Sequence, residues 1–86
     1  MEIKKGFKAV FEKKGGRYHI EITRHKDPIM DNILIVNSVG STKYENTWII
    51  EKDLAEWAGY FESEGYTEIK IIEDVESSKK NNKKKT

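Results

Sequence analysis

Two alternating segments separated by a pair of glycines constrain the fold of this chain more than any other feature. Apolar residues occupy every second position from residue 7 to 12 and again from residue 18 to 23. This period of two is typical of β-strands that bury one face. Gly15 and Gly16 lie between the two segments, and glycine readily adopts the positive φ that a tight hairpin turn requires. We therefore expect a β-hairpin whose inward-facing residues are Phe7, Ala9, Phe11, Tyr18, Ile20 and Ile22.

Further strands are predicted after a break at Pro28. Proline lacks a backbone N–H and restricts the residue before it, so we expect residues 29–32 to form a loop. Residues 33–39 are apolar on both alternating faces, which is typical of a central strand. Residues 40–46 are polar and predict a turn. Residues 47–50 form a short β-prone segment that can pair with the preceding strand.

The second half of the chain predicts one amphipathic helix. Asp53 followed by Glu56 fits a capping pattern, in which each side chain accepts a hydrogen bond from a free backbone N–H. Gly65 is placed to end the helix, because glycine often follows the last helical residues. Residues 66–73 then predict a returning strand. The apolar stripe expected to face the sheet consists of Leu54, Trp57, Ala58 and Phe61.

Together these elements predict an α+β fold. We expect a small, mainly antiparallel sheet of four to five strands with one amphipathic helix packed on one face, in the order β-β-β-(β)-α-β. Residues 1–75 should form this single domain, a length that can bury one small core. Residues 76–86 contain no aliphatic or aromatic side chain and predict a disordered, Lys-rich tail.

Charge is unevenly distributed along the chain, although the formal net charge is only +1. Residues 1–45 carry nine Lys or Arg and six Asp or Glu, whereas residues 46–78 carry two and nine. Residues 79–86 carry five Lys and no acid. Such asymmetry indicates surfaces that meet charged partners, but it does not identify them.

Several classes of protein are disfavoured by composition. The chain has no cysteine, so neither a disulfide framework nor thiolate zinc ligation is available. Its longest apolar run covers residues 33–36, far short of the roughly 20 residues of a membrane-spanning helix. We therefore expect a cytoplasmic protein without a membrane partner.

The sequence also disfavours an enzyme. His19 and His25 lie on one face of the predicted strand with Glu21 between them. The two histidines are about 20 Å apart at ~3.3 Å per residue, too far to bind one metal ion. No serine or threonine stands in a motif beside a base, and acids near a helix start are explained by the helix dipole. We expect a non-enzymatic protein with no metal and no cofactor.

Basic residues of the hairpin and its flanks are the leading functional candidates. Lysines neutralise phosphates and exposed aromatic rings stack on bases, although lysines also occur on edge strands to discourage aggregation. We favour a small non-catalytic protein that contacts the nucleic-acid backbone through this hairpin and the Lys-rich tail. The predicted contact residues are Lys4, Lys5, Lys8, Lys13, Lys14, Arg17, Arg24 and Lys26.

An alternative hypothesis uses the acidic helix. Glu56 faces outward, while Tyr60 and Glu64 flank one edge of the apolar stripe. Tyrosine offers a large, rigid contact that is enriched in protein interfaces, although an ordinary solvated helix face also explains these residues. In this hypothesis the chain is a protein-binding inhibitor or adaptor module of the phage or mobile-element type, and its contacts are Glu56, Tyr60 and Glu64.

Overall fold

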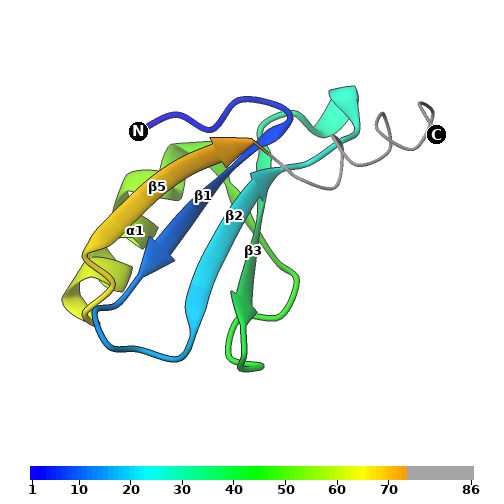
Figure 1. The fold of residues 1–86 in the computed structure, drawn as a ribbon. Helices are drawn as coiled ribbons and strands as arrows, with labels where there is room; N and C mark the ends of the chain where they lie inside the picture. Colours follow the sequence, from blue (N-terminus) through cyan, green and yellow to red (C-terminus); the bar gives the residue numbers. More distant parts are fainter. Residues whose placement is uncertain (74–86) are drawn as a thin grey trace, which may run out of the picture.

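A computed structural model describes residues 1–73. It consists of one antiparallel sheet with a single α-helix on one face, which confirms the predicted fold class (Figure 1). The expected lysine-rich tail lies outside the described residues. The elements are β1 (Phe7–Glu12), β2 (His19–Arg24), the 3-10 turn η1 (Pro28–Met30), β3 (Ile33–Val39), β4 (Thr47–Ile50), the 3-10 turn η2 (Glu51–Asp53), α1 (Leu54–Ser63) and β5 (Glu68–Glu73).

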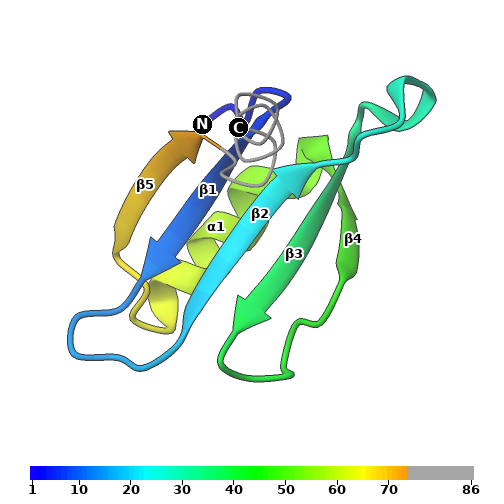
Figure 2. The ribbon, with the colours of Figure 1, turned by 45° about the vertical axis from the view of Figure 1, so that its right-hand side comes forward.

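The five strands lie in the order β4-β3-β2-β1-β5, and every neighbouring pair is antiparallel. The first four strands form a meander. The chain then leaves β4 at one edge, crosses behind the sheet as α1, and adds β5 at the opposite edge (Figure 2). Both edge strands are therefore supplied by the second half of the chain, and the hairpin of β1 and β2 lies at the centre.

Register determines which residues reach the core. Ala9 lies opposite Ile22, and Ile22 lies opposite Val36, so one row of side chains crosses three strands on the helix side. Phe11 and Ile20 form a second row. The complete core is Ile3, Ala9, Phe11, Ile20, Ile22, Leu34, Val36, Ile49, Leu54 and Phe61.

The α1 helix ends as its sequence predicts but begins differently. Gly65 has a φ of 104°, and the Tyr66 N–H donates to the Phe61 carbonyl at 3.0 Å while the Gly65 N–H donates to the Glu62 carbonyl. This is the Schellman arrangement that glycine favours. Asp53 makes no side-chain capping bond, because the chain enters the helix through the η2 turn, so the predicted capping pattern is wrong.

Fewer side chains are buried between the sheet and α1 than the alternating apolar positions of the sequence predict. Phe7 and Tyr18 are exposed, and Trp57 and Ala58 are only partly buried against the core. Phe7 begins β1 and Tyr18 precedes β2, so both lie at strand ends, and α1 has only ten residues, or about 15 Å. None of the helices between residues 1 and 73 is long and apolar enough to cross a membrane.

We predict that Phe61→Ala lowers the free energy of unfolding by about 3–5 kcal/mol, the usual cost of truncating a large buried aromatic side chain. Trp57→Ala should cost less, because its ring is partly solvated. Chemical denaturation followed by circular dichroism measures both values. A larger loss for Trp57→Ala than for Phe61→Ala would mean that residue 57 holds the helix on the sheet.

Candidate functional site

The fold separates the predicted basic residues into groups at the two ends of the sheet. Lys13, Lys14 and Arg17 lie in the loop between β1 and β2. At the opposite end of these strands, a second group of Lys4, Lys5 and Lys26 precedes β1 or follows β2. The two strands have six residues each, so the groups are about 20 Å apart.

Arg24 has a structural role. Its side chain is only 12% exposed, and its Nη2 lies 2.7 Å from a Glu51 carboxylate oxygen. Its Nε donates to the Ile3 carbonyl at 2.8 Å, and its Nη1 donates to the Asp31 carbonyl. The hydrogen bond from Arg24 lowers the pKa of Glu51 below its ordinary value. Arg24 thus ties the N-terminal segment and η2 to the sheet, and it is not free to bind phosphate.

Lys8 is also neutralised within the fold. It lies on the uncovered face of the sheet, where its Nζ is 3.3 Å from the Glu21 carboxylate. The ring of His19 approaches the same carboxylate at 2.9 Å. Burial alone would raise the pKa of Glu21, but the hydrogen bonds from His19 and Lys8 outweigh it and lower the pKa. On this face, the positive charge of Lys8 is therefore neutralised by the carboxylate of Glu21.

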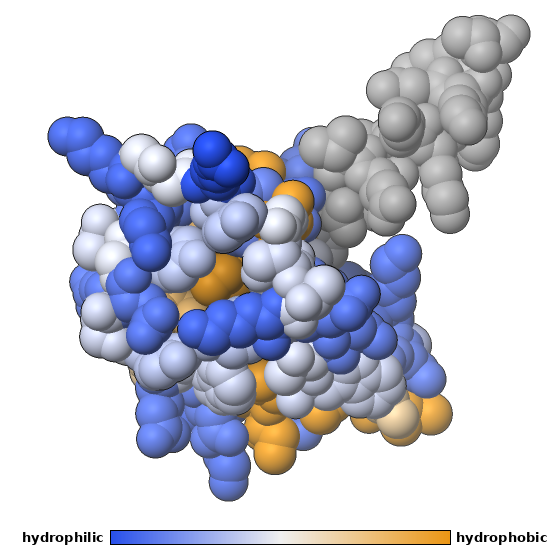
Figure 3. All heavy atoms as spheres, turned by 90° about the horizontal axis from the view of Figure 1, so that it is seen from below, coloured by the Kyte–Doolittle hydropathy of each residue, from blue (hydrophilic) through white to orange (hydrophobic). Residues whose placement is uncertain are grey.

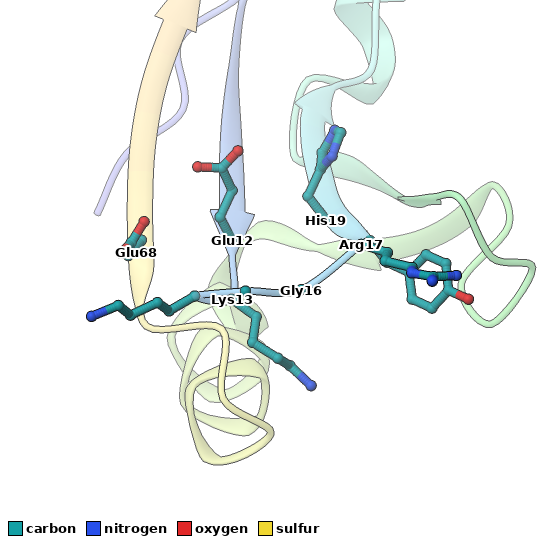
Figure 4. Close-up of a pocket in the computed structure, with 9 residues that line it drawn as sticks. Glu12, Lys13, Gly16, Arg17, His19 and Glu68 are labelled. Carbon is teal, nitrogen blue, oxygen red and sulfur yellow. The ribbon is translucent and has the colours of Figure 1, made fainter.

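The β1–β2 loop, in contrast, presents its cations to solvent. Lys13, Lys14 and Arg17 are all exposed, and none forms an ion pair with any residue between 1 and 73. Figure 4 places Lys13 and Arg17 on either side of Gly16, below the strand residues. Figure 3 looks onto this end of the molecule, where long hydrophilic side chains project from the surface. The loop lines a polar cleft of about 440 Å³.

Packing contacts hold the loop in place. The Gly16 N–H donates to the Lys13 carbonyl at 2.8 Å, and Gly15 between them has a φ of 74°, as a type II turn requires. The Lys13 Nζ lies 4.9 Å from the centre of the Tyr66 ring, which follows α1. The Lys13–Gly16 part of the loop is therefore held against the rest of the fold.

Tyr18 completes the loop and remains 46% exposed. Its ring lies directly on Gly40, where an added Cβ would approach the Tyr18 Cδ1 to 2.6 Å. Gly40 is therefore required for this ring position, and its φ of 94° disfavours other residues as well. The ring is fixed on one side and accessible on the other.

Two carboxylates border the cleft. Glu12 and Glu68 are directly opposite each other on β1 and β5, and both line the cleft. The Nζ of Lys70 lies 3.0 Å from the Glu12 carboxylate, and the hydrogen bond that Lys70 donates to Glu12 raises the pKa of Lys70. The acids are thus on the strands and partly compensated, whereas the loop between residues 13 and 18 carries only positive charge.

The structure places the three residues of the protein-binding hypothesis, Glu56, Tyr60 and Glu64, in two different environments. Glu56 and Tyr60 line one shallow cleft of about 460 Å³ between α1 and the segment that joins β3 to β4, together with Tyr44 and Trp57. Glu64 instead forms an exposed ion pair with Lys43 at 3.6 Å. Tyr44 was not predicted as a site residue, because it belongs to an irregular segment without periodicity. Only its position as an isolated aromatic residue in a polar turn could have indicated it.

We predict that Arg24→Met lowers stability at neutral pH by about 1.5–3 kcal/mol, the usual value of hydrogen bonds to charged groups. Because the folded pKa of Glu51 lies below its ordinary value of 4.5, the ion pair stabilises the protein above that pH. Its contribution is lost as the pH falls through the lowered pKa. Denaturation curves at several pH values should show the difference between variant and wild type narrowing in acid, while the part due to the Ile3 and Asp31 carbonyls remains. Unchanged stability with lost nucleic-acid binding would place Arg24 in an interface instead.

Between residues 1 and 73, no group of three or more His, Cys, Asp or Glu side chains is arranged to hold a metal ion. Comparisons with protein-family models, with curated proteins and with solved structures give no match for this chain. What the protein binds must therefore be inferred from the positions and charges of its own side chains.

Proposed function

We propose that this protein is a non-catalytic nucleic-acid-binding protein that contacts the phosphate backbone through its β1–β2 loop. The observation that supports the proposal is a difference among its cations. Lys8, Arg24, Lys43 and Lys70 are all held in ion pairs, whereas the three cations of the loop have no such partner among residues 1–73. Lys4, Lys5, Lys26 and Lys52 have none there either, so what distinguishes the loop is three unpaired cations within five residues, beside the exposed Tyr18. Exposed, uncompensated cations on one ordered loop suit polyanion binding.

Tyr18 favours a single-stranded ligand. Its exposed ring lies next to Arg17, so a base could stack on the ring while the guanidinium contacts the adjoining phosphate. In a duplex the base faces are covered by their neighbours, and only the phosphates remain accessible to the loop. The five lysines of residues 79–86 add sequence-independent attraction to the same polyanion. Binding of this kind positions the protein without reading a base sequence.

The central prediction compares two charge reversals. Replacing Lys13, Lys14 and Arg17 by Glu should reduce the slope of log affinity against log salt by roughly 2–3, because each lost phosphate contact removes about 0.7–0.9. The matched control replaces Lys4, Lys5 and Lys26 by Glu and has the same net charge. Fluorescence polarisation with single- and double-stranded DNA and RNA at several salt concentrations measures both variants.

The control should bind more tightly than the loop variant at every salt concentration. Equal losses in the two variants would mean that net charge and not the loop governs binding. An absence of wild-type binding at low salt would reject the proposed function altogether. Melting curves establish that both variants remain folded, since all six positions are exposed.

A second prediction concerns Tyr18. Tyr18→Ala should weaken binding of single-stranded nucleic acid by about 1–3 kcal/mol, the usual value of one base stacked on an aromatic ring. Tyr18→Phe should retain most of the affinity, because the ring does the stacking. Duplex binding should change little in either variant. If Tyr18→Ala weakens duplex and single-strand binding equally, the ring supports the loop rather than a base.

A further inference from the structure

An aromatic cleft lies between α1 and the segment that joins β3 to β4. Its walls are Tyr44, Trp57 and Tyr60, and Glu56 lies at its margin. The centres of the Tyr44 and Trp57 rings are 6.2 Å apart, and the ring planes are nearly perpendicular at 82°. The cleft thus has two aromatic walls nearly at right angles to each other, with the Glu56 carboxylate beside them.

These rings rest on a rigid support. Phe61 is fully buried beneath them, and its ring centre lies 5.4, 5.9 and 6.0 Å from those of Tyr44, Trp57 and Tyr60. The backbone of Tyr44 is fixed as well, because its N–H donates to the Ser38 Oγ and its carbonyl accepts from the Ser38 N–H, both at 3.1 Å. A site formed in advance loses little conformational entropy when a ligand binds.

The electrostatic environment of the cleft favours a cation. Residues 53–64 include four carboxylates and no Lys or Arg. Glu64 is paired with Lys43, whereas Glu56, which lines the cleft, has no ion-pair partner among residues 1–73. Burial, with Tyr60 and Glu64 nearby, raises the pKa of Tyr44, so its ring stays neutral. The protein already places one ammonium over this ring, since the Lys43 Nζ lies 5.5 Å from its centre.

We propose that this cleft binds a lysine or arginine side chain from a basic segment of another protein. The aromatic faces attract the cationic head through their quadrupoles, and Glu56 supplies the opposite charge. A polyanion is repelled by the same helix, so this site is separate from the loop and does not depend on the nucleic-acid proposal. The chain then carries a positive surface and a negative one, as an adaptor between two partners would.

The test uses a full-length Trp48→Phe protein, in which Trp57 is the only tryptophan. Trp48 is exposed on the uncovered face of the sheet, so its replacement leaves the cleft intact. The probe is a short glycine-rich peptide with two arginines, and the control peptide carries citrulline, the uncharged isostere, in their place. The arginine peptide should change Trp57 emission saturably, and the citrulline peptide should not.

Matched substitutions assign the effect to the cleft. Glu56→Gln and Tyr60→Ala should each weaken binding of the arginine peptide several-fold, and the double variant on the order of tenfold. Glu62→Gln, which removes the same charge from an exposed position outside the cleft, should change affinity less than twofold. Tyr60→Phe should retain binding, because it keeps the ring.

Three results would overturn the proposal. Equal binding of the citrulline peptide would mean that charge is not recognised. An equal effect of Glu62→Gln and Glu56→Gln would mean that the peptide follows the overall charge of the helix. Finally, the five lysines of residues 79–86 can be replaced by Gln in the full chain. A change of Trp57 emission on that replacement, without peptide, would identify the chain's own C-terminal segment as the occupant.

Discussion

Phe61 of α1 lies edge-on against Phe11 of β1, with ring centres 5.4 Å apart, and both side chains are fully buried. This contact joins the two layers, because α1 is the only α-helix between residues 1 and 73 and Phe61 is its largest fully buried side chain. Such ring pairs add about 0.5–1.5 kcal/mol to the free energy from burial. The outer side of Phe61 supports the rings of the aromatic cleft, so the packing that stabilises the fold also shapes its surface.

The cationic side chains also differ in their surroundings: some are held by other residues of the fold, and others extend into solvent. Arg24 joins segments distant in sequence, because it contacts Ile3, Asp31 and Glu51 at once. A guanidinium suits this role, since its fixed fork of donors can satisfy several acceptors together. Lysines have a flexible stem and a strongly hydrated head, and those of the β1–β2 loop remain in solvent. Arg24 therefore holds distant segments together, whereas the loop cations have no ion-pair partner among residues 1–73.

Local patterns in the sequence predicted most of the fold, because strands, hairpins and helix ends depend on neighbouring residues. Gly15 of the β1–β2 loop and the Gly65 helix end follow from backbone sterics alone, since both have a positive φ. Contacts between distant segments could not be predicted in this way: Arg24 belongs to the predicted cationic surface in the sequence, and only the fold places Glu51, 27 residues later, beside it. Ile3 and Tyr44 were missed for the same reason, since neither belongs to a periodic segment.

The β1–β2 loop contacts the chain just after α1, the helix that contributes three of the four residues lining the aromatic cleft. Lys13 of the loop packs against Tyr66 and its stem lies close to Gly65, directly after the helix that bears the aromatic cleft. A phosphate on the loop and a basic segment on the helix would carry opposite charges. Oppositely charged ligands bound on neighbouring surfaces attract one another, and this attraction is screened beyond about 10 Å at 0.1 M salt. If both proposals hold, a polyanion on the loop and a basic protein on the helix should bind more tightly together than alone, to the extent that the two ligands lie within this screening length.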